Sequence, residues 1–220
     1  MAIKIIPNFL RRIFFNLFAV KKHIELGFYG PPNSGKTTLA NRISKDWTGE
    51  ELGKVSKIPH ETREIQAKEV EIKSKDGSRS INCNLIDTPG IATKIDYEEF
   101  LHHGLNVKEA KKRAKEATKG VIESIKWLDD MDAVIVVLDG SQNPYTQVNI
   151  TIIGNLVARK TPVLIVANKM DKRKANVKKI EAAFPEYEVV GISAKYGKNI
   201  EEFYESLFNL VKKSKKKKKE

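Results

Sequence analysis

The chain has 220 residues, 40% hydrophobic and 31% charged, which is typical of one well-filled globular domain with short extensions. The single cysteine, Cys83, excludes an intrachain disulfide, and its alternating apolar surroundings predict a reduced thiol in the core. Of the net charge of +12, residues 1–23 carry +5 and residues 212–220 carry +6, which leaves +1 for residues 24–211. This is a near-neutral domain with two basic ends, not a uniformly basic protein.

Residues 1–23 predict a basic amphipathic helix. Pro7 suits a first helical position, and apolar side chains recur at three- and four-residue steps, at Ile6, Leu10, Ile13, Leu17 and Val20. The apolar run 13–20 is too short to span a bilayer, and no small-residue cleavage site follows it. Two interpretations remain: a helix that binds a membrane surface or a partner, and a helix folded back on its own domain.

Residues 30–37 read Gly-Pro-Pro-Asn-Ser-Gly-Lys-Thr and fit the phosphate-binding pattern G-x-x-x-x-G-K-[ST]. Glycines allow the tight turn that points backbone N–H groups at phosphate oxygens. A predicted strand over 24–29 precedes the loop and a helix follows it, so the helix N-terminus faces the phosphates. Lys36 places its charge between the β and γ phosphates, and the Thr37 hydroxyl is a ligand for Mg²⁺. The candidate phosphate-binding residues are Gly30, Asn33, Ser34, Gly35, Lys36, Thr37 and Thr38.

Two alternating runs, residues 65–73 and 79–86, are separated by Asp76-Gly77 and predict a β-hairpin. The second run ends in Asp87-Thr88-Pro89-Gly90. An aspartate at a strand end beside a phosphate loop holds Mg²⁺, directly or through water. We therefore expect Asp87 at the metal and the Gly90 N–H at the γ-phosphate.

Buried strands are predicted over residues 133–138, 162–167 and 188–192. The second ends in Asn168-Lys169-Met170-Asp171, the pattern N-K-x-D of a guanine site. A carboxylate accepts guanine N1–H and the 2-amino group together, whereas adenine would leave it unpaired. Asn168 would bridge the base and the phosphate loop, and the Lys169 stem would cover the ring. The third strand ends in Ser193, Ala194 and Lys195, which resemble the S-A-K box of guanine-nucleotide-binding proteins, and this resemblance implies that a backbone N–H of the box contacts guanine O6.

With these boxes in this order, residues 24–211 resemble the Era-like branch of the translation-factor-related GTPases. The resemblance implies an α/β P-loop G domain, with a mostly parallel six-stranded sheet and helices on both faces. It also implies Mg²⁺-dependent GTP hydrolysis to GDP. Glu61-Thr62-Arg63 is similar to the branch's switch I motif, so Thr62 would ligate Mg²⁺ and sense the γ-phosphate. The resemblance covers residues 24–211 and includes no G-x-x-G-bearing KH module, so we do not expect the rRNA role of Era to carry over directly.

Ile91 follows Gly90, where Ras-like GTPases carry a glutamine that orients water. An aliphatic side chain forms no hydrogen bond to water, so we expect slow intrinsic hydrolysis. In relatives with asparagine at the Asn33 position, that residue helps to bind K⁺, so we expect K⁺ to stimulate turnover. The catalytic candidates are Lys36, Asn33, Thr62 and Gly90. His102-His103 is interpreted as a loop pair, with water activation as the alternative.

Residues 106–109 fit a helix capping box, and an apolar stripe from Val107 to Leu128 predicts core packing. A last helix is predicted over residues 200–211, followed by a disordered polybasic tail, residues 212–220. In a doubly wound sheet both chain ends should emerge at the pole opposite the nucleotide.

Three interpretations of that pole remain. It binds an anionic membrane, or it binds RNA or the ribosome, or the tail only aids solubility beside a docked helix. We expect a cytoplasmic protein, peripheral at the inner face of the membrane if lipid is the partner. A protein effector and a GTP-dependent dimer are further expectations. The alternative to a hydrolytic switch is a GTP-gated binding module at a membrane or RNA surface, with negligible unassisted hydrolysis.

Overall fold

The computed structural model of the protein describes residues 23–53, 65–92, 95 and 97–217. The helix predicted for residues 1–23 lies outside the described residues, except for His23. Thr62 and residues 218–220 also lie outside them.

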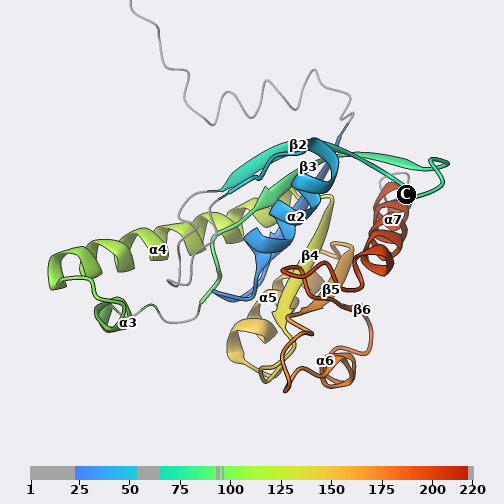
Figure 1. Ribbon diagram of the computed structural model, residues 1–220. Helices are drawn as coiled ribbons and strands as arrows, with labels where there is room; N and C mark the ends of the chain where they lie inside the picture. The colour runs from blue at the N-terminus through green and yellow to red at the C-terminus, as the bar shows by residue number, and fades with distance from the viewer. Residues whose placement is uncertain (1–22, 54–64, 93–94, 96, 218–220) are drawn as a thin grey trace, which may run out of the picture.

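Six strands form one sheet in the order β2-β3-β1-β4-β5-β6 (Figure 1). The strands are β1 (Ile24–Tyr29), β2 (Gln66–Lys73), β3 (Ser80–Asp87), β4 (Ala133–Asp139), β5 (Val163–Asn168) and β6 (Glu188–Gly191). β2 and β3 form the predicted antiparallel hairpin, and all other neighbours are parallel. This arrangement confirms the expected α/β fold with a mostly parallel, mixed sheet.

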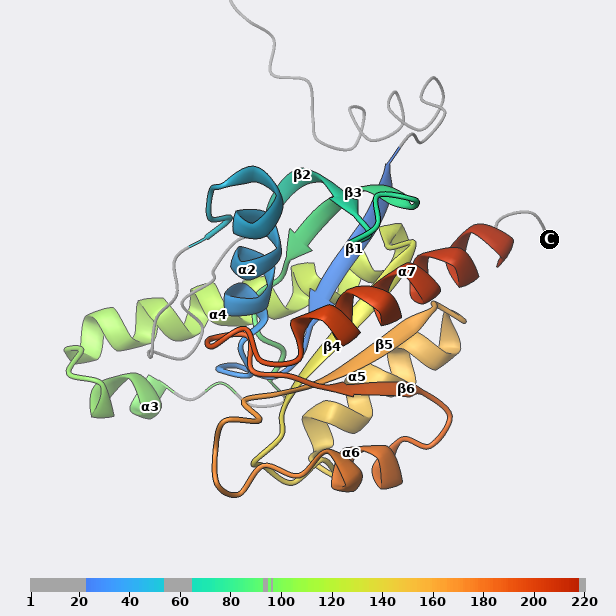
Figure 2. The ribbon, with the colours of Figure 1, turned by 45° about the vertical axis from the view of Figure 1, so that its right-hand side comes forward.

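Helices cover both faces of the sheet, with α2 and α7 on one face and α4 and α5 on the other (Figure 2). The helices are α2 (Lys36–Thr48), α3 (Tyr97–His102), α4 (Val107–Trp127), α5 (Gln147–Ala158), α6 (Val177–Ala183) and α7 (Ile200–Lys217), with a 3-10 turn, η1 (Leu128–Asp130), after α4. Strand side chains alternate between the faces. Leu26 and Phe28 therefore pack with Phe203 of α7 in one core, and Tyr29 joins the other core.

Helix α4 begins at the predicted capping box. Glu109 N donates to Asn106 Oδ1 (2.9 Å), and Asn106 N donates to Glu109 Oε2 (3.3 Å). The predicted core stripe is buried at Ala110 and Ala117, but the prediction is wrong for Val107, which is 53% exposed. Val107 lies in the first turn of α4, in the half that packs against the short helix α3.

The sequence also placed the end of the last helix too early. α7 continues to Lys217, so the prediction of a disordered tail is wrong for residues 212–217. Lysine is a good helix former, and cations are favourable near a helix C-terminus. Ser214 is buried and its Oγ donates to Val211 O (2.9 Å). Lys213 Nζ lies 3.7 Å from Glu188 Oε2, so α7 runs back to the amino edge of the sheet, as expected.

None of the helices in the described part of the chain is long and apolar enough to cross a membrane.

Candidate nucleotide-binding site

The predicted phosphate loop lies between the carboxyl end of β1 and the first turn of α2, and two of its glycines are required by their surroundings. A Cβ on Gly30 (φ +151°) would lie 2.2 Å from Val137 O, and one on Gly35 (φ +100°) would lie 2.2 Å from Asn168 Nδ2. Asn33 also has a left-handed backbone, with φ +57°. Larger side chains would force the loop away from β4 and β5, so the sequence pattern corresponds to real close contacts.

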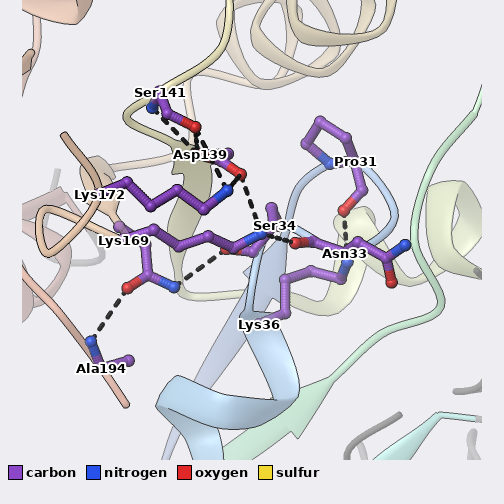
Figure 3. A network of polar contacts seen from close by, with 10 residues as sticks. Pro31, Asn33, Ser34, Lys36, Asp139, Ser141, Lys169, Lys172 and Ala194 are labelled. Carbon is purple, nitrogen blue, oxygen red and sulfur yellow. Dashed lines mark hydrogen bonds and ion pairs between the residues drawn. The ribbon is translucent and has the colours of Figure 1, made fainter. Parts of the chain in front are cut away.

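Lys36 is buried inside this loop, where its Nζ donates to Pro31 O (2.9 Å; Figure 3). Burial lowers the pKa of Lys36 to about 8; the Asp87 carboxylate opposes this shift and Lys169 adds to it. A cation held in a poorly solvated cradle gains most from an anionic ligand. The environment of Lys36 therefore fits a phosphate group.

The predicted metal ligands Thr37 and Asp87 are in contact. Strands β1 and β3 pair in parallel with Phe28 opposite Asp87, which brings the end of β3 beside the phosphate loop. Thr37 Oγ1 donates to Asp87 Oδ2 (2.6 Å), and Asp87 is fully buried. A hydroxyl and a carboxylate are hard oxygen donors of the kind that Mg²⁺ prefers. These two residues fit the metal that the motif implies.

The Asp87–Gly90 segment also packs on the phosphate loop. A Cβ on Gly90 would lie 2.8 Å from Cα and N of Pro32, and Ile91 N donates to Gly30 O (3.1 Å). The Ile91 side chain is 3% exposed and packs in the core on the α4 side of the sheet.

Ser34 Oγ is buried and has no hydrogen-bond partner among the described residues, which leaves a polar atom for a ligand.

Asn168 joins the phosphate loop to the two segments predicted to bind guanine. Its Nδ2 donates to Ser34 O (3.0 Å), and Ala194 N donates to its Oδ1 (3.0 Å) (Figure 3). Asn168 is 3% exposed, so both contacts are shielded from water. Ser193 Oγ donates to Asp171 Oδ1 (2.6 Å), which orients the exposed carboxylate.

The sequence interpretation missed Asp139 at the end of β4. Lys169 Nζ and Lys172 Nζ each donate to Asp139 Oδ2 (2.9 Å), and Lys169 Nζ also donates to Asn33 O (Figure 3). Burial alone would raise the pKa of Asp139. Hydrogen bonds from Ser141, Lys172 and Lys169 outweigh burial and hold this pKa well below its usual range. Asp139 thus fixes Lys169, the lysine of the N-K-x-D box. The sequence feature that could have identified Asp139 is its position at the end of a predicted strand, which it shares with Asp87.

The remaining predicted residues lie as follows. Thr38 is half-buried in the first turn of α2, and Lys195 is exposed with its Nζ 4.8 Å from the centre of the Tyr196 ring. His102 ends α3 and His103 follows it, both exposed.

Residues 25–169 match the protein family described as 50S ribosome-binding GTPase. The chain belongs to this GTPase family. Two curated relatives at similar distance are GTPase Der of Fusobacterium nucleatum, 32% identical over 72% of this chain and 31% of Der, and GTPase Era of Clostridium botulinum, 31% identical over 83% of this chain and 53% of Era. The tRNA modification GTPase MnmE of Chlorobium chlorochromatii is 29% identical over 87% of this chain and 36% of MnmE.

The chain thus spans between about a third and a half of the length of these relatives. A solved structure of Era in complex with MgGDPNP and 16S ribosomal RNA aligns over 86% of this chain and 57% of that chain, with a TM-score of 0.66 and 22% identity. This likeness shows a common fold. The comparisons establish a GTPase family shared by Era, Der and MnmE, without assigning the chain to the Era branch in particular.

Proposed function

We propose that this protein binds GTP with Mg²⁺, hydrolyses it to GDP and acts as a molecular switch. The observation that carries the proposal is the pair of hydrogen bonds through which Asn168 joins the phosphate loop to the Ser193–Lys195 loop. Because of this link, residues suited to phosphate and residues suited to guanine form one continuous site.

On the phosphate side, Lys36 and the backbone N–H groups of the loop bind the phosphates, and the Gly90 N–H contacts the γ-phosphate. Thr37 and Asp87 supply oxygen ligands to the metal, and Thr62 is the third proposed ligand. Bound Mg²⁺ would supply positive charge to the triphosphate oxygens.

On the base side, Asp171 accepts from guanine N1–H and the 2-amino group while Ser193 holds the carboxylate in place. The Lys169 stem covers the ring, and the backbone N–H groups of the Ser193–Lys195 loop face O6. Asp171→Asn should weaken GTP binding at least tenfold and favour xanthosine triphosphate, because the amide replaces an acceptor with a donor. The exposed carboxylate Glu186, changed to Gln, is the control; GTP affinity unchanged by Asp171→Asn would refute the guanine assignment.

We also propose that K⁺ accelerates hydrolysis through Asn33. The buried Ile91 side chain offers no hydrogen bond to the attacking water. A cation bound near the phosphates could instead stabilise the negative charge of the transition state. Turnover should be faster in K⁺ than in Na⁺ at matched ionic strength. Equal rates in the two salts would contradict this part of the proposal.

The partner that we propose is RNA or the ribosome, in the cytoplasm. The family description and the rRNA in the Era complex support this choice, and the basic chain ends supply cations for phosphates. An anionic membrane is the competing surface. Co-sedimentation with ribosomes and with anionic liposomes, comparing the full chain with residues 24–211, separates the two.

The second candidate function is a GTP-gated binding module without unassisted hydrolysis, and the burial of Ile91 favours it. Single-turnover hydrolysis by the purified chain in K⁺ decides between them. Measurable turnover supports the switch that hydrolyses GTP by itself, and GTP binding without turnover supports the module.

A further inference from the structure

Helix α4 concentrates positive charge in a domain that is otherwise slightly acidic. Its 21 residues include seven Lys or Arg and three Glu, a net charge of +4. Because residues 24–211 together carry +1, the rest of that range has a net charge of −3. The separation of charge is therefore within the folded domain and does not depend on the chain ends.

The lysines of α4 form a stripe, defined here as Lys108, Lys112, Lys115 and Lys119. Their spacing of four, three and four residues places them within about 60° of one another around a helix and over about 16 Å of its length. All four are exposed, and Lys112 and Lys119 have side chains 78% and 79% exposed. The opposite face of the helix is buried, at Ala110, Ala117, Gly120 and Ser124.

The stripe is only weakly neutralised. Lys112 lies 4.0 Å from Glu116 and Lys119 lies 3.9 Å from Glu123, and such exposed pairs contribute little. No acidic residue among those that the structure describes pairs with Lys108 or Lys115. The half of α4 that carries the stripe projects past the sheet together with α3 (Figures 1 and 2), where a large partner can reach it.

The exposed apolar side chains beside the stripe, Val107 (53% exposed) and Ile122 (51% exposed), stand singly near its two ends, so the stripe fits a polyphosphate backbone better than a membrane. A membrane-surface helix needs a free apolar face as well as charge, and the apolar face of α4 is used in packing on α3 and the sheet. RNA requires only the release of counterions from successive phosphates.

The stripe is also connected to the predicted γ-phosphate segment. Ser124 Oγ lies 3.3 Å from Pro89 O, next to Gly90, and shares its single proton between this oxygen and Gly120 O (2.8 Å). Tyr29 OH donates to Ser124 O (3.0 Å). Tyr29 directly precedes the phosphate loop. If the γ-phosphate displaces the Asp87–Gly90 segment, the buried hydrogen bonds at Ser124 would therefore shift α4 as well.

We propose that the lysine stripe of α4 binds the backbone of RNA, and that its affinity changes between the GDP and GTP states. The second part rests on the proposed function as a nucleotide switch. The first part stands on charge and geometry alone.

The test is fluorescence anisotropy of a labelled 20-nucleotide poly(U) strand with the full chain, titrated at several salt concentrations. The variant Lys112→Gln, Lys115→Gln, Lys119→Gln removes three charges and keeps helix propensity. Losing three phosphate contacts should lower the slope of log K against log salt by about 2, and the affinity about 10- to 100-fold at 0.1 M salt.

The matched control changes Lys174, Lys178 and Lys179 to Gln, which removes the same charge from exposed positions in and before α6. If both variants lose affinity equally, the effect is one of net charge and the stripe is refuted. If the stripe variant loses binding to phosphatidylglycerol vesicles but keeps its affinity for RNA, the proposal is overturned in favour of lipid.

Nucleotide coupling is measured with the wild-type chain in GDP and in a non-hydrolysable GTP analogue. The RNA affinities should differ at least fivefold, and Ser124→Ala should reduce the difference. Equal affinities would refute the coupling. GTP binding is measured on the same samples. Because the lysine stripe lies outside the nucleotide-binding residues, this measurement shows separately whether the proposed function holds.

Discussion

Asp139→Asn is the most direct test of how the base site is held in place. The Asp139 side chain is 13% exposed and accepts from two lysines at once, Lys169 (27% exposed) and Lys172 (43% exposed). Removing one partner of a fully buried ion pair costs about 3–5 kcal/mol. Both lysines can turn toward water here, so we expect a loss of about 1–3 kcal/mol, or a fall in Tm of about 4–8 °C for 2 kcal/mol.

The nucleotide should report the same change more specifically. Once released, Lys169 no longer fixes the loop at Asn33, and we expect GDP and GTP affinity to fall about tenfold, equivalent to about 1.4 kcal/mol. Lys172→Gln is the control, because it removes the more exposed partner and leaves Lys169 bound to Asp139. Its effect on nucleotide affinity should be less than threefold. Isothermal titration calorimetry measures both, and equal affinity losses in the two variants would refute the reasoning.

The pH dependence of this contribution has a definite sign. Because the pKa of Asp139 is lowered on folding, its stabilisation is fully present above the ordinary carboxyl pKa and is lost as the pH falls through the folded value. The difference in unfolding free energy between wild type and Asp139→Asn should therefore be constant from pH 5 to 7 and shrink below about pH 4. A difference that grows on acidification would contradict the assignment.

Three further variants or reactions test the fold and the loop. Gly35→Ala should abolish detectable nucleotide binding by calorimetry, since the new Cβ meets Asn168 at 2.2 Å, whereas Gly49→Ala (φ +78°, no atom within 4 Å) should cost only about 1 kcal/mol and leave binding intact. Leu26→Ala, in the fully buried core, should lower the free energy of unfolding in urea by about 2–5 kcal/mol; a loss below 1 kcal/mol would contradict the packing. Burial raises the pKa of Cys83 to about 12. At pH 8 a thiol reagent should therefore modify the native chain at least a hundredfold more slowly than the unfolded chain. Equal rates would exclude a buried thiol.

The parts that could be predicted from the sequence are those whose chemistry lies in adjacent residues. The phosphate loop, the Asp87–Gly90 turn and the Asn106–Glu109 capping box each contain their own interaction partners or glycine requirements. Their local geometry follows from a few neighbouring positions. The strands could be located from local patterns too, since buried parallel strands such as β4 and β5 give continuous apolar runs and the antiparallel pair β2–β3 gives alternating runs around Asp76-Gly77.

The parts that were missed depend on contacts between distant segments. Asp139 gains its role because β4 and β5 pair with Asp139 opposite Asn168, and this register cannot be read from either strand alone. Val107 belongs to the apolar stripe of α4 by spacing, yet the helix projects past the surface that would have covered it. The end of α7 depends on Lys213 and Ser214 meeting β6 and the preceding turn, which outweighs the repulsion expected in a lysine run.

The central place of β1 has a consequence for how this protein is made. Ile24 pairs with Cys83 and Leu26 pairs with Ala133, so the first strand to leave a ribosome has both neighbours far along the chain. Until β3 is synthesised, β1 has no strand to pair with, and its other edge stays open until β4 follows. Completion of the sheet should therefore be slow and late, and until β4 is made the open edge of β1 exposes the nascent chain to aggregation.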